Sequence, residues 1–143
     1  MTEGTAQSIE IDASPEEIFA VAVEIERYPE WASGVSRVEV LERDEQERPL
    51  RAAFELEGFV KKISYELTYS YDQPTRMSWV ADPNSDLDLL EGSYTFTETD
   101  GATEVVYVLR VKPNFPIPGF IRRQAEKQIV STALRGLRQQ VEA

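Results

Sequence analysis

Residues 8–21 read Ser-Ile-Glu-Ile-Asp-Ala-Ser-Pro-Glu-Glu-Ile-Phe-Ala-Val. Residues 8–13 alternate apolar and polar side chains, which predicts a half-buried strand over this range. The inward side chains of this strand would be Ile9, Ile11 and Ala13. Ser14 then suits a helix N-cap, Pro15 suits the first helical position, and Glu17 completes a capping box. Apolar residues continue at helical spacing: Ile18, Phe19, Ala22 and Ile25. The stretch therefore predicts a strand that leads directly into a capped helix.

After this helix the sequence indicates a break and then a long series of strands. Tyr28-Pro29 should end the helix, because the residue before proline is pushed out of the α region. Residues 29–32 would form a second short turn of helix. From Val35 to Lys112 the apolar residues recur with period two, and turn-like sequences separate the segments. The predicted strands are Val35–Glu42, Leu50–Phe59, Lys61–Tyr71, Thr75–Ala81, Asp88–Glu98 and Thr103–Lys112. Their short connections predict sequential antiparallel pairing.

The end of the chain predicts one long helix. Residues 113–120 contain three prolines, and no proline follows them. An apolar stripe then runs to the C-terminus through Ile121, Ala125, Ile129, Ala133 and Leu137, widened by Val130, Leu134 and Val141. The charged residues expected mostly on the opposite face are Arg122, Arg123, Glu126 and Lys127. At 1.5 Å per residue this helix would be roughly 35 Å long. No internal repeat or linker is evident, so we expect a single domain over residues 1–143.

Strand parity predicts an aromatic face under that helix, since alternate side chains of a strand lie on one side of a sheet. In Lys61–Tyr71 most odd positions are apolar or aromatic and the even ones are mostly polar, so the odd face should be covered. The polar-tipped aromatic residues that share the covered face are Tyr65, Tyr69, Trp79, Tyr94 and Tyr107. Buried Tyr and Trp usually need a hydrogen-bond partner. The face therefore belongs either to a lined cavity or to an ordinary core whose hydroxyls reach the rim of the sheet.

Composition excludes several kinds of chemistry. The chain has 143 residues, which is enough for a sizeable core, and a formal net charge of −11. It has no Cys, which excludes disulfides, thiolate nucleophiles and iron–sulfur clusters. It has no His, which excludes Ser-His-Asp and Cys-His catalysis. Any chemistry must rest on carboxylates, Tyr, Lys, Arg and shape, and we expect neither a metal site nor a cofactor.

The charge is divided unevenly along the chain. Residues 110–143 carry seven basic and two acidic residues, a charge of +5, so residues 1–109 carry −16. The acidic balance disfavours nucleic acid as a partner, because phosphate binding needs a basic field. The basic C-terminal helix is either a solvated face on an acidic body or a docking surface for an anionic membrane or partner.

The sequence predicts neither a membrane span nor a signal peptide. No apolar run approaches the roughly 20 residues that span a bilayer. The first seven residues lack both a basic and an apolar region of the kind that a signal peptide needs. We therefore expect a cytoplasmic protein, and the lack of Cys fits a reducing compartment. No feature of the sequence indicates an oligomeric state.

Three further segments carry a family resemblance. Residues 24–31 read Glu-Ile-Glu-Arg-Tyr-Pro-Glu-Trp, residues 90–96 read Leu-Glu-Gly-Ser-Tyr-Thr-Phe, and residues 101–105 read Gly-Ala-Thr-Glu-Val. Together with residues 8–21, they resemble the opening strand and helix, the Tyr-Pro-x-Trp motif and the late hairpin of the SRPBCC (START/birch-pollen-allergen-like) superfamily. The resemblance covers about residues 8–141. It is closest to the bacterial polyketide cyclase/dehydrase and lipid-transport branch, with coenzyme-Q-binding relatives nearby.

The resemblance implies an α+β helix-grip fold. In this fold a curved seven-stranded antiparallel sheet wraps around a long C-terminal helix, with two short helices after strand 1. It also implies a cavity for an apolar small molecule, opening near Tyr28–Ser33 and Asn114–Phe120. By position, Trp31, Phe115 and Phe120 either gate this cavity or plug its end. The predicted ligand-binding residues are Trp31, Phe54, Leu56, Ile63, Tyr65, Tyr69, Trp79, Leu90, Tyr94, Tyr107, Phe120, Gln128, Ile129 and Thr132.

Two hypotheses place a ligand in the cavity. The first is a carrier or binding module for a lipid, a quinone or a polyketide-like molecule. It is favoured because no strand centre places Asp, Glu, Lys or Arg inward, and general acid–base catalysis needs a titratable group beside the substrate. Lys61 has inward parity but lies at a strand end. The second is a polyketide cyclase/dehydratase-like enzyme that uses tyrosines and pocket shape, with no catalytic residue assigned.

A third hypothesis concerns the segment before the last helix. Apolar residues next to arginines are typical of interfacial docking. The residues that would contact a membrane are Phe115, Ile117, Phe120, Arg122 and Arg123. The alternative for this segment is a proline-fixed turn that packs its apolar residues on the core.

Overall fold

The computed structural model describes residues 4–32, 34–57, 62–83 and 86–143. Its strands are β1 (Thr5–Ile11), β2 (Val35–Arg43), β3 (Pro49–Glu57), β4 (Lys62–Asp72), β5 (Arg76–Ala81), β6 (Leu87–Thr99) and β7 (Ala102–Pro113). Its helices are α1 (Pro15–Ala22), the short 3-10 helix η1 (Ile25–Arg27), α2 (Tyr28–Trp31) and α3 (Gly119–Glu142). The order of these elements is the one that the sequence predicts.

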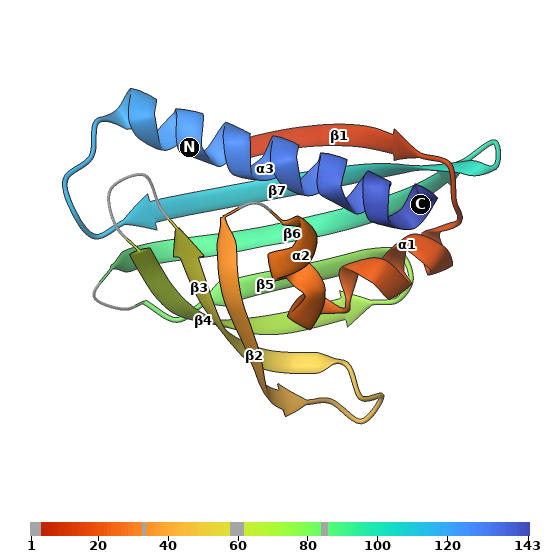
Figure 1. Cartoon of the computed structure of the whole chain (residues 1–143), viewed down its shortest axis with the longest axis horizontal. Helices are drawn as coiled ribbons and strands as arrows, with labels where there is room; N and C mark the ends of the chain where they lie inside the picture. Colours follow the sequence, from red (N-terminus) through yellow and green to blue (C-terminus); the bar gives the residue numbers. More distant parts are fainter. Residues whose placement is uncertain (1–3, 33, 58–61, 84–85) are drawn as a thin grey trace.

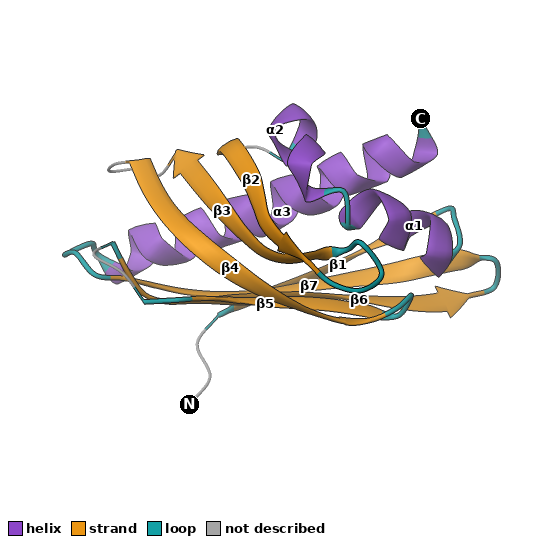
Figure 2. Ribbon diagram, turned by 90° about the horizontal axis from the view of Figure 1, so that it is seen from below, coloured by secondary structure: helices purple, strands orange, loops and turns teal. Residues whose placement is uncertain are grey.

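The strands of the described residues form one seven-stranded antiparallel sheet in the order β1-β7-β6-β5-β4-β3-β2. Strands β2 to β7 pair with their neighbours in the chain, whereas β1 joins the far edge beside β7. Figure 1 shows α3 lying along β1 and β7. In Figure 2, β2, β3 and β4 rise beside α3 while β5, β6 and β7 run beneath it. The sheet is therefore curved around α3, which confirms the predicted helix-grip fold.

Helix α1 begins as predicted but ends earlier. The Ser14 hydroxyl accepts the Glu17 amide at 3.2 Å, and the Glu17 carboxylate accepts the Ser14 amide at 3.2 Å, so the capping box is confirmed. The helix ends at Ala22 rather than near Tyr28, which corrects the prediction. The Tyr28 hydroxyl donates a hydrogen bond to the Ala22 carbonyl. This bond satisfies one of the carbonyls left free at the end of α1, so the chain turns back through η1 into α2.

Strand bounds differ from the prediction by only a few residues at the ends. The larger difference is at β1, which begins at Thr5 and ends at Ile11, whereas residues 8–13 were predicted. Several predicted residues lie outside the described part of the chain: Ser33, Gly58, Phe59, Lys61, Asn84 and Ser85. The prediction that Lys61 has inward parity therefore falls on a residue outside the described part of the chain. In β6 a register shift against β7 falls between Leu87 and Leu89.

The densely packed core and a cavity lie under different halves of α3. Under the C-terminal half of α3, α1 packs against both α3 and β6. The fully buried side chains there include Ile18, Phe96, Val105 and Leu137. Thr103 of β7 donates from its hydroxyl to the Ala13 carbonyl at 2.7 Å, which holds the loop before α1 on the sheet. The N-terminal half of α3 covers a less filled region, which contains a cavity.

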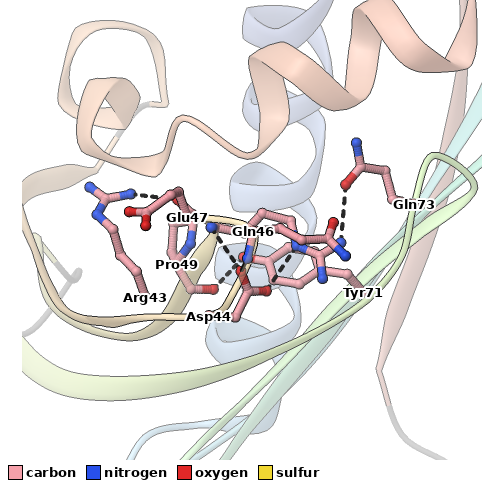
Figure 3. Close-up of polar contacts among 8 residues, drawn as sticks. Arg43, Asp44, Gln46, Glu47, Pro49, Tyr71 and Gln73 are labelled. Atoms are coloured by element: carbon pink, nitrogen blue, oxygen red, sulfur yellow. Dashed lines mark hydrogen bonds and ion pairs between the residues drawn. The ribbon is translucent and has the colours of Figure 1, made fainter.

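The hairpin between β2 and β3 is tied to β4 by a polar network (Figure 3). The Asp44 carboxylate accepts the Gln46 and Arg48 amides at 2.9 and 3.0 Å, and it pairs with the Arg48 guanidinium at 2.8 Å. Arg48 in turn donates to the Gln73 side chain at 3.0 Å and lies over the Tyr71 ring, 4.5 Å from its centroid. These contacts lock the hairpin geometry within the protein, so we assign the network a structural role.

Candidate ligand cavity

A cavity of about 250 Å³ lies between the sheet and the N-terminal half of α3. Strands β2 to β7, α2, α3 and residues 113–117 all contribute to its wall. The wall is mainly apolar and aromatic. Its volume is slightly below the range of about 300–1,000 Å³ that is common for small-molecule sites. A molecule with one or two rings, or a short acyl chain, suits a space of this size.

The cavity brings together most of the residues that the sequence predicts as ligand-binding. The predicted residues that line it are Phe54, Leu56, Ile63, Tyr65, Tyr69, Trp79, Leu90, Tyr94, Tyr107, Gln128, Ile129 and Thr132. The strand residues among them follow from parity, because each predicted strand is present and its alternate side chains face one side. Trp31 and Phe120 are not part of the wall. Ligand contact by any of these residues stays a prediction.

Trp31 lies between α2 and α3 instead. Its ring makes an edge-on contact with Tyr28, with centroids 4.9 Å apart. Its backbone and ring lie directly against Gly136 of α3, where an added Cβ would come within 2.5 Å of the Trp31 carbonyl oxygen. Trp31 therefore packs where α2 and α3 approach each other closely, outside the residues that line the cavity.

Phe120 also lies away from the cavity, in the first turn of α3. It is 67% exposed, the highest value among the exposed large apolar side chains of the described residues. Of the three predicted gate residues, only Phe115 reaches the wall, together with Ile117 from the same segment. Residues 113–117 thus cover one end of the cavity, while Phe120 is turned outward.

Aromatic rings of the cavity wall cluster around Trp79. The centroid of the Trp79 ring lies 5.4 Å from that of Tyr94 and 5.7 Å from that of Tyr107, both in edge-on arrangements. Trp79 pairs with Gly92 across β5 and β6, and a Cβ on Gly92 would lie 2.8 Å from the indole ring. The indole can therefore lie flat across β6 only because residue 92 has no side chain.

Four tyrosine hydroxyls and one indole N–H reach this cavity without a protein hydrogen-bond partner among the described residues. They belong to Tyr65, Tyr69, Trp79, Tyr94 and Tyr107. In the same part of the chain, no side-chain polar atom is both buried and without a partner. These polar tips must therefore reach space that water can occupy, which is the cavity itself. Burial raises the pKa of all four tyrosines above the usual value, so their hydroxyls stay protonated at neutral pH.

The sequence reasoning missed a buried acid on the wall. Glu126 is 2% exposed, although it was expected on the solvent face of α3. Its carboxylate accepts the Thr5 hydroxyl at 3.2 Å and the Val111 amide at 3.0 Å, and it pairs with Arg122 at 3.5 Å. Val111 lies beyond Leu109, the last β7 residue that pairs with β1 in the described ladder. Glu126 thus satisfies a backbone donor on β7 that β1 does not reach.

Glu126 was misplaced because α3 packs against strands on one side of its apolar stripe and faces the cavity on the other. Glu126 is buried in line with Val130 and Leu134 at i+4 and i+8, beside Ala133 and Leu137, and all of these except Glu126 belong to the predicted stripe. One side of the apolar stripe packs on β1 and β7, while Ala125 and Ile129 on its other side face the cavity and are only half-buried. The sequence feature that indicates a paired Glu126 is its i, i+4 spacing from Arg122, because opposite charges at this spacing interact on one helix face.

Other lining residues were also missed. Leu67, Leu109 and Val111 have the parity of the predicted aromatic residues on the same strands and could have been included. Leu87 could not, because the register shift in β6 brings an odd position inward on a strand whose even positions face the cavity. In the described residues, no three Cys, His, Asp or Glu side chains meet in a way that would hold a metal ion.

The cavity opens to solvent near the start of α3. Gln128 of α3 and Glu57 at the end of β3 are both exposed and both belong to the wall. Phe115 and Ile117 border the same region and are half-buried. A ligand of moderate size could therefore reach the aromatic residues without unfolding any helix or strand.

An antiparallel sheet that grips a long C-terminal helix over an aromatic cavity defines a helix-grip protein. The chain belongs to the family described as polyketide cyclase/dehydrase and lipid transport, whose model matches residues 11–138. The resemblance to the START-like superfamily is thereby confirmed. A search of curated proteins found no significant match.

Solved structures agree on the fold. A START superfamily protein from Mycobacterium smegmatis is 18% identical, with a TM-score of 0.87 over 99% of this chain and 98% of that chain. The Zhui aromatase/cyclase from Streptomyces sp. R1128 is 9% identical, with a TM-score of 0.84 over 98% and 93%. A STAR-related lipid transfer protein from Xanthomonas axonopodis is 14% identical, with a TM-score of 0.73 over 96% and 85%. At these identities the likeness shows a shared fold. Among the described helices, none is long and apolar enough to cross a membrane.

Proposed function

We propose that this chain binds an apolar small molecule in the cavity between the sheet and α3, as a carrier or binding module. The observation that carries the proposal is an aromatic wall whose hydroxyls and indole N–H lack partners in the described protein. Such a site buries an apolar body and offers it a few hydrogen bonds. The family description, which joins polyketide cyclases and dehydrases with lipid transport, supports a ligand of the lipid or polyketide kind.

The chemistry of the wall favours binding over catalysis. Protonated tyrosines donate and accept hydrogen bonds but are poor proton acceptors, so they orient a ligand rather than ionise it. The charged residues Arg122 and Glu126 do line the cavity, but they come from α3, where they were expected mostly on the opposite face, and not from a strand centre. The oxygens of Glu126, however, already accept three hydrogen bonds from the protein. We therefore assign no catalytic residue.

Native mass spectrometry of the protein purified from its own host, without detergent or organic solvent, tests this proposal. We expect a fraction of the protein to carry an added mass that organic extraction removes. Analysis of the extract would then identify the ligand. The proposal fails if the chain carries no added mass and the extracted protein also binds none of a panel of fatty alcohols, quinones and aromatic polyketides.

A second proposal, peripheral docking on an anionic membrane, is supported by the outer face of α3. The exposed Phe120 is followed at i+3 and i+7 by Arg123 and Lys127, so the three side chains share one helix face. Apolar and basic residues combined in this way favour the lipid interface. The face adjoins the cavity opening at Gln128, where a ligand would be exchanged with the bilayer.

We expect the protein to co-sediment with vesicles that contain phosphatidylserine at low salt and to be released at high salt. Each basic residue near an anionic surface contributes about 1 kcal/mol, so Arg123→Gln with Lys127→Gln should weaken binding by about 30-fold. The matched control is Arg135→Gln with Arg138→Gln, which removes the same charge from the far half of α3. Absence of binding at low salt, or equal weakening by both pairs, would reject docking through this face.

A further inference from the structure

Glu126 stands out because it is the one charged residue in the described ranges that is fully buried. Its oxygens face Thr5, Val111 and Arg122, and it borders the cavity through α3. A buried carboxylate is stable only where hydrogen bonds and a cation compensate it. Arg122 supplies that cation, and its guanidinium also donates to the Val111 carbonyl at 3.4 Å. The two charges therefore form one neutral unit in the wall.

The remaining charge of the wall is negative. Among the described residues that line the cavity, Arg122 is basic, and Glu57 and Glu126 are acidic. No second cation is present there to compensate an anionic ligand. The other polar groups of the wall are neutral: tyrosine hydroxyls, the indole N–H of Trp79, Thr132 and Gln128. A carboxylate that entered would lose its water and meet a cation already engaged by Glu126.

From this arrangement we infer that the cavity selects ligands whose polar end is neutral, such as a hydroxyl or a ketone, over ligands that end in a carboxylate. The inference rests on the proposed ligand binding and names the chemical class of the ligand. A hydroxyl or carbonyl group finds tyrosine hydroxyls that both donate and accept. It needs no counter-ion. A carboxylate of the same shape gains the same apolar contacts but loses its water, and the cation of the wall already compensates Glu126.

Two probes of nearly equal shape test this selectivity. 2-Naphthol and 2-naphthoate place the same two rings in the aromatic wall but end in a neutral hydroxyl or an ionised carboxylate at neutral pH. Isothermal titration calorimetry of the extracted protein (residues 1–143) would measure both affinities. We expect 2-naphthol to bind at least about tenfold more tightly, because an ionised carboxylate loses its hydration without gaining a counter-ion of its own.

Variants locate the source of the preference. Glu126→Gln keeps an oxygen for the Val111 amide but removes the anion that pairs with Arg122. The ratio of the affinity for 2-naphthol to the affinity for 2-naphthoate should therefore fall by at least about tenfold. Arg122→Gln removes the cation and should raise the ratio. The control is Glu104→Gln, an exposed acid on the outer face of β7 that should leave the ratio unchanged. Because the two cavity variants shift the ratio in opposite directions, general destabilisation of the fold cannot mimic the result.

The outcomes separate this inference from the proposed function. Binding of both probes with equal affinity, or a ratio that Glu126→Gln leaves unchanged, overturns the selectivity but leaves ligand binding intact. Binding of neither probe overturns the selectivity, while added mass on the protein from its host would still support ligand binding. A preference for 2-naphthol that Glu126→Gln abolishes and Glu104→Gln retains supports the inference.

Discussion

Replacing Gly136 with alanine should destabilise the fold by about 2 kcal/mol, as expected for overpacking against a rigid neighbour. Alanine normally stabilises a helix interior relative to glycine by about 1 kcal/mol. Here the added Cβ would meet the Trp31 carbonyl oxygen at 2.5 Å and its ring at 2.9 Å. Backbone atoms cannot rotate away as a long side chain can, so α2 would have to move from α3.

Urea denaturation of Gly136→Ala and the wild type measures this effect. Gln139→Ala is the control, since residue 139 is exposed on the same helix and its change should stay within about 0.5 kcal/mol. An increase in stability for Gly136→Ala would show that helix propensity outweighs the contact and that α2 does not pack closely on α3. The far-ultraviolet circular dichroism of both variants should remain that of the wild type below the transition.

Filling the cavity from α3 should abolish ligand binding. Ala125 lines the cavity and is half-buried, so Ala125→Phe would place an aromatic ring in a space of about 250 Å³. Because most of that space would then be occupied, we expect the affinity for 2-naphthol to fall by about 100-fold, or about 2.7 kcal/mol. We also expect the protein from its own host to lose any retained ligand.

Gln124→Phe is the matched control. Residue 124 is exposed and does not line the cavity, and successive helix positions point about 100° apart. The same ring placed there should leave binding unchanged. Calorimetry of both variants, with thermal melts to verify folding, checks the prediction. Wild-type affinity in Ala125→Phe would place the binding site elsewhere on the molecule.

Local features of this protein are predictable because they depend on neighbouring residues. The capping box at Ser14 and Glu17 needs only a short spacing, and the inward position of Tyr65 and Tyr69 follows from the period of a strand. Periodicity does not say how the strands and helices are arranged, and the family resemblance in residues 8–21, 24–31, 90–96 and 101–105 supplies that arrangement. For these reasons the fold and the strand part of the cavity could be read from the sequence.

The helix part of the cavity could not be read in the same way. An apolar stripe shows that one face of a helix is covered, but it does not identify the covering elements. A stripe that faces both a sheet and a cavity has the same sequence pattern as one that faces a solid core. Ile129 and Val130 are equally apolar, yet Val130 is fully buried and Ile129 is half-buried at the cavity. The rotation of α3 about its axis is set by its contacts with β1 and β7.

The order of residues is enough to identify the aromatic side chains, the strand face that they share and the lack of His and Cys. Contacts made in the folded protein are needed to place Trp31 on Gly136, Phe120 on the outside and Glu126 inside beside Arg122. The reason is physical: alternation within a strand is a property of the backbone, whereas the contacts of a helix depend on partners that are distant in the chain. Glu126 is buried because β7 offers it an unpaired amide, and residues 111 and 126 meet only when the sheet closes on α3.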